Sequence, residues 1–188
     1  MNLAVFGSGF GSNFTAISNA IKDKKIDAKI TLVVVDNPNA QLIQKAKDDN
    51  IKTFVFNPKD YNSKKDYELE IVKQCKDSDV DLIVLAGYMR ILESTLLSEY
   101  PNKIINIHPS LLPAFKGKDA IGQAIDYGVK VMGVSVHYVN EQMDGGTIID
   151  QEAFYVSDMN KEEIEHKIHS IEHVLYPKVI QKIIKGGN

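Results

Sequence analysis

The chain has 188 residues, of which 44% are hydrophobic and 25% are charged, and this length suits one well-packed domain over residues 1–188. Its net charge of −3 provides no broad basic surface for a nucleic acid, and no apolar segment approaches the ~20 residues that cross a bilayer. A single cysteine excludes an internal disulfide, and no cluster of cysteine and histidine has the spacing of metal ligands. We therefore expect a cytoplasmic protein with no metal, nucleic acid or membrane among its partners.

Short apolar runs alternate with helical patterns through the first part of the chain. The apolar runs predict strands over residues 2–6, 29–35, 53–56, 81–87 and 103–107. The patterns between them predict helices over about 13–23 and 40–49, and a third helix from near Ser63, which forms a capping-box pattern with Asp66. Because the run 81–87 is apolar on both faces, it fits a central parallel strand that helices cover.

The pattern changes after residue 107. Residues 131–139 and 147–156 are two long strand-like runs, which predict an antiparallel extension of the sheet near the C-terminus. A final helix is expected from near Asn160, with Glu163 as its reciprocal cap. The predicted fold class is therefore α/β: an open, mostly parallel twisted sheet with helices on both faces and an antiparallel extension.

In such a sheet, ligands bind beyond the carboxyl ends of the strands, where the strand order reverses. Four predicted loops lie at that edge, at residues 7–13, 87–92, 106–118 and 140–146. The groups that carry the chemistry are expected in these loops.

The glycine-rich stretch GSGFGSN, residues 7–13, follows a predicted strand and opens a predicted helix. Free N–H groups in the first turn of a helix favour a phosphate, and glycines let the backbone approach it closely. The spacing departs from the dinucleotide fingerprint G-x-G-x-x-G and lacks the lysine of a P-loop, so a purely structural turn stays open as an alternative. Asp36, at the end of the second strand, fits a ribose contact or, better, the start of the turn DNPN.

The stretch NIHPSLLP, residues 106–113, places Asn106 and His108 on one face of a strand, where both side chains can reach a single ligand atom. An amide donor suits a developing oxyanion, and an imidazole can hold a proton near neutral pH. Pro109 and Pro113 stiffen the following loop. The alternative is a histidine at a strand end that simply bonds a backbone carbonyl.

A carboxylate near His108 would keep that imidazole charged, and Asp144 in MDGG is the best-placed candidate. Taken alone, Asp-Gly is more typical of a hairpin turn. The segment 86–92 fits an apolar slot for a flat heteroaromatic ligand, or plain core packing. His137 lies in the middle of a strand and is expected to be structural. Glu172 is expected opposite the apolar stripe of the last helix, free to meet a cationic amine or simply solvated.

Together the motifs GSGFGSN, LAGYMRIL, NIHPSLLP, KGKDAIGQA, SVHYV, MDGG and EHVLYP resemble the phosphoribosylglycinamide formyltransferase family, folate-dependent enzymes of purine biosynthesis. The resemblance spans nearly the whole chain. It implies a Rossmann-like formyltransferase fold and transfer of a formyl group from 10-formyltetrahydrofolate to the amine of glycinamide ribonucleotide, without a metal. Both ligands are small molecules, and we expect a monomer or a weak homodimer.

The resemblance also implies roles for individual residues. The substrate site comprises Gly11, Ser12 and Asn13 around the phosphate, and His169, Ser170, Ile171 and Glu172 near the glycinamide end. The folate site comprises Lys64, Met89, Arg90, Ile91, Leu92, Asn106, Asn140, Glu141, Gln142, Met143 and Asp144. The catalytic residues are Asn106 and His108, which stabilise the oxyanion, and Asp144, which keeps His108 charged and assists proton transfer.

Two points stay open at this stage. A non-catalytic nucleotide-binding module would use the same glycine loop, but it would not need Asn106, His108 and Asp144 to converge. In addition, many relatives have proline before the glycine of the loop after Pro113, where this chain has Lys116.

Overall fold

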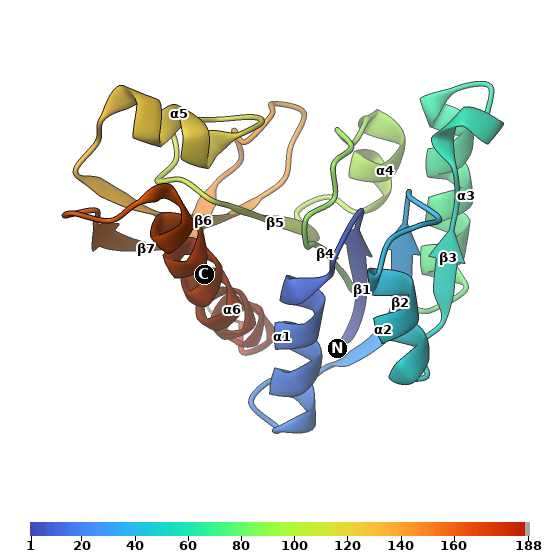
Figure 1. Ribbon diagram of the computed structural model, residues 1–188. Coiled ribbons are helices and arrows are strands. Elements are labelled where there is room, and N and C mark those ends of the chain that lie inside the picture. Colours follow the sequence, from blue (N-terminus) through green and yellow to red (C-terminus); the bar gives the residue numbers. More distant parts are fainter. Residues whose placement is uncertain (187–188) are drawn as a thin grey trace.

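Across residues 1–186, which a computed structural model describes, seven strands form one sheet in the order β3-β2-β1-β4-β5-β6-β7 (Figure 1). The strands are β1 (Asn2–Gly7), β2 (Lys29–Val35), β3 (Thr53–Val55), β4 (Leu82–Leu85), β5 (Ile104–His108), β6 (Val131–Tyr138) and β7 (Ile148–Tyr155). Neighbouring strands from β3 to β5 are parallel, and β6 and β7 are antiparallel to their neighbours. The predicted fold class, including the antiparallel extension, is confirmed.

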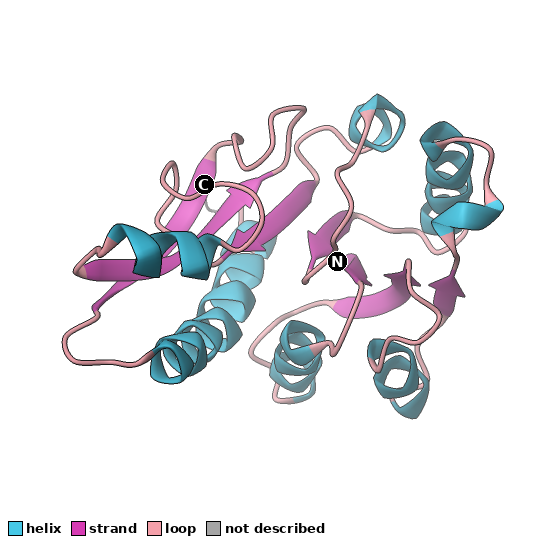
Figure 2. Cartoon of the chain, turned by 45° about the horizontal axis from the view of Figure 1, so that its top comes forward, coloured by secondary structure: helices cyan, strands magenta, loops and turns pink. Residues whose placement is uncertain are grey.

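Helices pack on both faces of this sheet (Figure 2). They are α1 (Ser12–Lys22), α2 (Leu42–Asp48), α3 (Lys64–Lys76), α4 (Ser94–Glu99), α5 (Ala120–Tyr127) and α6 (Lys161–Ile184). Because successive strand residues point to opposite faces, Leu3 and Val5 join the core formed with α1, α2 and α6, whereas Ala4 and Phe6 join the core formed with α3 and α4. Among these residues, no helix is both long and apolar enough to span a membrane.

The predicted helix starts are confirmed where a polar side chain caps the backbone. Asn160 and Glu163 form the expected reciprocal capping box at the start of α6. Ser63 accepts a hydrogen bond from the Asp66 amide, as one half of a capping box does. Helices α4 and α5 were not predicted, because both are short and α5 contains a glycine.

Helix α6 is tied directly to the strands that lead into the predicted site. The hydroxyl of Tyr176, which is fully buried, lies 2.9 Å from the Leu85 carbonyl and 3.1 Å from the Ile105 carbonyl. Leu85 ends β4, and Ile105 directly precedes Asn106 in β5. One side chain therefore connects α6 to both strands at the edge where the predicted ligand-binding loops begin.

We expect Tyr176→Phe to lower the free energy of unfolding by about 1–2 kcal/mol, because two buried carbonyls lose their shared donor while the ring still packs. Urea unfolding of the purified protein measures this change. Tyr155→Phe is the matched control, since Tyr155 is 77% exposed and should leave stability unaltered. Equal stability of the wild type and Tyr176→Phe would show that the hydroxyl does not tie the helix to the sheet.

Candidate active site

The predicted loops meet in pairs at the carboxyl edge of the parallel strands. The Ser8 amide donates to the Gly87 carbonyl at 3.1 Å, and the Met89 amide donates to the Ser8 hydroxyl at 2.9 Å. These bonds join the loops after β1 and β4, the two strands between which the strand order reverses. The Gly117 amide donates to the Asp144 carboxylate at 2.8 Å and so joins the loop after β5 to the loop between β6 and β7.

The Asp144 carboxylate lies between two imidazoles. Its Oδ2 atom is 3.6 Å from Nδ1 of His108, and its Oδ1 atom is 3.6 Å from Nε2 of His137. His108 ends β5 and His137 lies in β6, and both histidines are almost fully buried. The structure therefore brings His108 and Asp144 together, as the sequence analysis predicted.

The Asp144 side chain remains a carboxylate in this environment. Burial acts to raise its pKa, but the nearby imidazole of His137, the hydrogen bond from the Gly117 amide and the imidazole of His108 together outweigh burial, so the pKa is lowered. The backbone of Asp144 has a φ of 47°, a left-handed conformation that aspartate tolerates better than most residues. Because the loop between β6 and β7 spans residues 139–147, Asp144 and Gly145 are not the centre of a two-residue hairpin turn.

His108 makes a second contact that fixes one of its protons. Its Nε2 atom lies 2.8 Å from the Phe115 carbonyl, which can only accept, so Nε2 carries a hydrogen. The carbonyl contact that was the alternative interpretation of this histidine is therefore present together with the Asp144 contact. The other ring nitrogen, Nδ1, faces the Asp144 carboxylate at 3.6 Å.

Buried hydroxyl groups hold the loop that follows His108. The Ser135 hydroxyl donates to the Ser110 carbonyl at 2.6 Å and accepts from the Leu112 amide at 3.0 Å. The Ser110 hydroxyl donates to the Ala114 carbonyl at 2.6 Å. The prolines predicted to stiffen this loop are thus supplemented by Ser135 and Ser110, which the sequence analysis did not identify.

His137 also belongs to the site, which was not predicted. The Asn106 amide nitrogen lies 3.2 Å from Nε2 of His137. Nδ1 of His137 lies 2.8 Å from the Tyr138 carbonyl, which can only accept, so Nδ1 donates that bond and Nε2 accepts the one from Asn106. The signal for this contact is the pairing of β5 with β6, which sets Asn106 opposite His137.

The glycine-rich loop leads into α1, and no side chain among the described residues caps the N-terminus of that helix. Gly11 precedes the helix at a φ of 76°. A Cβ atom at Gly11 would lie 2.9 Å from a methyl carbon of Leu42, because α2 packs closely against the loop. The Asn13 amide is buried and donates to the Glu172 carboxylate at 3.2 Å. Backbone amides suited to an anion thus lie beside the start of α1.

The structure corrects the expected position of Glu172. Its side chain is not free on the solvent face of α6 but is 6% exposed and turned toward α1. The same carboxylate oxygen accepts from Asn13 and lies 3.0 Å from Nδ1 of His169. The hydrogen bond with Glu172 raises the pKa of His169 against the opposing effect of burial.

Two other α6 residues that were predicted for the substrate site, Ser170 and Ile171, do not direct their side chains to the glycine-rich loop. The Ser170 hydroxyl donates to the Lys167 carbonyl at 2.7 Å, and Ile171 is buried in the hydrophobic core. Of the four α6 residues expected near the substrate, the structure places the side chains of His169 and Glu172 next to Asn13.

The loop after β4 divides into exposed and buried positions. Met89 is 74% and Ile91 is 53% exposed, whereas Leu92 is buried in the core. Arg90 pairs with the buried carboxylate of Asp36 at 2.7 Å. Asp36 therefore anchors the Arg90 loop, and it is Asn37 whose side chain accepts the turn bond from the Asn39 amide.

Of the remaining residues predicted for the folate site, 140–143 lie in the loop between β6 and β7, and Lys64 lies at the start of α3. Lys64 is exposed and lies 3.2 Å from Glu93. A cavity of about 240 Å³ is lined by Ser94, Leu97, Ser98, Val139, Asn140 and Glu141. The Asn140 side chain accepts from the Gln142 amide at 3.0 Å, and Met143 is half exposed.

The described residues contain no group of three or more histidine, cysteine, aspartate or glutamate side chains arranged to hold a metal ion. Cys75 is fully buried, and burial raises the pKa of its thiol to about 12. A thiol with that pKa is protonated at neutral pH and is a poor nucleophile.

Comparisons with known proteins agree with this geometry. The formyl transferase family matches residues 1–180. The chain is 50% identical to phosphoribosylglycinamide formyltransferase of Bacillus subtilis (strain 168), over 98% of this chain and 95% of that protein. It also superposes on glycinamide ribonucleotide transformylase 1 from Geobacillus kaustophilus with a TM-score of 0.95 and 51% identity, over 97% of each chain. Phosphoribosylglycinamide formyltransferase from Bacillus halodurans superposes with a TM-score of 0.95 and 44% identity, over 98% of this chain and 95% of that one.

We expect Glu172→Gln to lower the pKa of His169, because the main interaction that raises it is lost. The pKa of His169 in the folded protein is raised above its ordinary value of 6.5. The His169–Glu172 pair therefore stabilises the fold fully below pH 6.5, and this stabilisation is lost as the pH rises through the raised pKa of His169. NMR titration of the histidine ring protons measures both variants and the wild type. Glu165→Gln is the control and should shift the pKa of His169 less, because Glu165 acts only at a distance.

Proposed function

The chain belongs to the formyl transferase family, and on that basis we propose that it transfers the formyl group of 10-formyltetrahydrofolate to the amine of glycinamide ribonucleotide. The products are N-formylglycinamide ribonucleotide and tetrahydrofolate, in purine biosynthesis. One observation carries the proposal: the Asp144 carboxylate lies beside His108 at the carboxyl edge of the sheet, next to Asn106 and His137. The names of the similar proteins supply the substrate.

The arrangement suits acyl transfer to an amine. The amine nitrogen forms a bond to the formyl carbon, whose bond to the folate nitrogen then breaks; the amine loses a proton, and the departing nitrogen gains one. In the tetrahedral intermediate the former carbonyl oxygen carries negative charge. Asn106 donates to that oxygen through the amide hydrogen that does not bind His137, and a protonated His108 donates through Nδ1, because its Nε2 hydrogen is bonded to the Phe115 carbonyl. Asp144, whose carboxylate lies 3.6 Å from Nδ1, stabilises the positive charge on His108 and assists the proton transfer.

The rest of the carboxyl edge has features suited to the two ligands. The uncapped first turn of α1 at Gly11, Ser12 and Asn13 suits the substrate phosphate, with Glu172 and His169 next to it. For the folate, the exposed Met89 and Ile91 offer apolar surface. Lys64, Arg90, Leu92 and residues 140–144 complete the proposed folate site.

Substitution of the proposed catalytic residues tests this function. We expect His108→Ala and Asp144→Asn each to lower kcat by about 100- to 1,000-fold, because each removes charge stabilisation of the oxyanion. Steady-state assays with 10-formyltetrahydrofolate and glycinamide ribonucleotide measure the rates. His166→Ala is the control, since His166 is exposed on α6 and should retain full activity. A wild-type protein that binds a dinucleotide and transfers no formyl group would instead be a nucleotide-binding module.

The proposed phosphate site has its own test in the glycine loop. We expect Gly11→Ala to raise KM for glycinamide ribonucleotide about tenfold, because Gly11 has a positive φ and its Cβ would press against Leu42. Gly9→Ala is the control, since a Cβ there meets nothing within 4 Å. Equal KM values for the two variants would argue against binding of the phosphate at this turn.

A further inference from the structure

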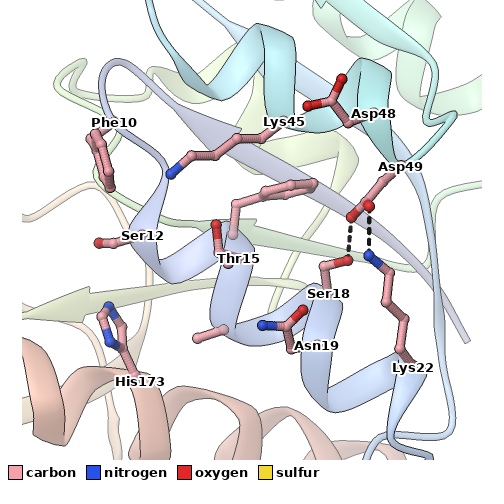
Figure 3. Close-up of a pocket in the computed structure, with 12 residues that line it drawn as sticks. Phe10, Ser12, Thr15, Ser18, Asn19, Lys22, Lys45, Asp48, Asp49 and His173 are labelled. Atoms are coloured by element: carbon pink, nitrogen blue, oxygen red, sulfur yellow. Dashed lines mark hydrogen bonds and ion pairs between the residues drawn. The ribbon is translucent and has the colours of Figure 1, made fainter.

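Two parts of the structure adjoin the glycine-rich loop. One is a cavity of about 750 Å³ along α1, lined by residues of that loop and of α1, α2 and α6, which adjoins the proposed phosphate turn (Figure 3). The other is the loop after β4, residues 86–93, which Ser8 joins to the glycine-rich loop. This second loop carries the exposed Met89 and Ile91, so its conformation determines where apolar surface is offered to the folate.

Glu68 of α3 is a buried carboxylate that holds the end of this second loop. Its side chain has no solvent exposure, and none of the ion pairs formed by residues 1–186 includes it. One carboxylate oxygen accepts from the Glu93 amide at 2.7 Å, and the other accepts from the Leu96 amide at 3.1 Å. Glu93 is the N-cap residue of α4, and its own side chain makes no capping bond. Glu68 therefore caps α4 from a different helix.

The core around Glu68 does not require a carboxylate. Tyr67 and Ile71 of α3 and Leu96 of α4 belong to the same apolar cluster. Burial raises the pKa of Glu68, although the two amides act to lower it. An apolar side chain of similar size would suit such surroundings without the loss of hydration. The presence of the carboxylate is therefore explained by the two amides that it holds and not by the packing of the core.

A second buried carboxylate holds the middle of the same loop. Nε of Arg90 donates to Asp36 at 2.7 Å, and Asp36 directly follows β2. Only Ile91 and Leu92 lie between Arg90 and the Glu93 amide. Leu92 is buried in the core and Ile91 is exposed, so the backbone between the two carboxylates turns one apolar side chain inward and one outward. The exposed position of Ile91 thus depends on bonds at both ends of this short segment.

We propose that Glu68 is a positioning residue for the formyl donor, because its bonds to the Glu93 and Leu96 amides keep residues 89–93 in the conformation that receives the folate. This role rests on the proposed function, since it concerns the folate site of that same reaction. A side chain with no exposed surface does not contact a ligand itself. Its effect passes through Glu93, whose carboxylate lies 3.2 Å from Lys64, another residue of the proposed folate site.

The variant Glu68→Gln keeps the size of the side chain but replaces one acceptor oxygen by a donor that faces a backbone amide. We expect it to raise KM for 10-formyltetrahydrofolate about tenfold, and to leave kcat and KM for glycinamide ribonucleotide within about twofold of the wild type, because one backbone bond of the folate loop is lost. Glu70→Gln is the matched control. The Glu70 carboxylate accepts from Gln74 of its own helix, so both KM values should stay unchanged.

A shorter carboxylate distinguishes hydrogen bonding from packing. Glu68→Asp keeps both acceptor oxygens but leaves a small void, whereas Glu68→Gln fills the space and loses an acceptor. If Glu68 positions the loop, Glu68→Asp should retain a lower KM for the formyl donor than Glu68→Gln. A role in packing alone would give the reverse order and would overturn the proposal.

Two further measurements need no formyl transfer. Amide hydrogen exchange of residues 89–96 should be faster in Glu68→Gln than in the wild type, whereas exchange in β1 and β5 should be equal and so show that the fold is intact. Calorimetric titration with tetrahydrofolate should show binding to Glu68→Gln that is weaker by the same factor as the rise in KM. Titration with glycinamide ribonucleotide should give equal affinities.

The outcomes are distinct. Equal exchange at residues 89–96, faster exchange without weaker binding of tetrahydrofolate, or an equal rise in both KM values would each overturn the role of Glu68. Faster exchange together with weaker tetrahydrofolate binding would support this role even in a protein that transfers no formyl group to glycinamide ribonucleotide. In that case the proposed function alone would fail.

Discussion

A carboxylate buried among other groups is stable only where hydrogen bonds and positive charge replace the lost water, and this requirement shapes the candidate active site. Asp144 meets it with the Gly117 amide and the imidazoles of His108 and His137. The three partners come from separate parts of the chain: β5, the loop after it, and β6. The antiparallel extension of the sheet therefore contributes to the candidate active site, because β6 supplies His137 opposite Asn106 and the loop after β6 supplies Asp144.

The glycine-rich loop has the opposite electrostatic requirement. Here a backbone turn suited to an anion lies beside the buried carboxylate of Glu172, which alone would repel a phosphate. His169 compensates Glu172, and on the other side of the loop Lys45 adds a positive charge that forms no ion pair within residues 1–186. The two halves of the carboxyl edge thus each combine one largely buried carboxylate with nearby nitrogen bases.

The sequence predicted the features that depend on local residue patterns. It did not predict the contacts that depend on how distant segments pack together. Periodicity predicts the strand positions, and the capping pattern predicts the start of the last helix at Asn160. The sequence motifs predict that His108 and Asp144 lie close together. The position of Glu172 could not be derived, because helical periodicity alone does not show that α1 packs on that side of α6. The contacts of His137 could not be derived for a similar reason. Its polar neighbour, Asn106, lies on the adjacent strand, and the register between β5 and β6 is not encoded in either strand alone.

Helix α6 links the two halves of the site mechanically. Glu172 contacts the glycine loop, and Tyr176, one turn later on the same helix face, contacts the backbone of β4 and β5 just before the catalytic loops. Because a helix is stiff over one turn and the Tyr176 hydroxyl lies between two buried carbonyls, α6 cannot shift relative to the sheet without losing hydrogen bonds at both places. The distance between the glycine-rich turn and the Asn106–His108 strand is therefore set by this helix, which would keep a substrate bound at the turn within reach of the residues on the strand.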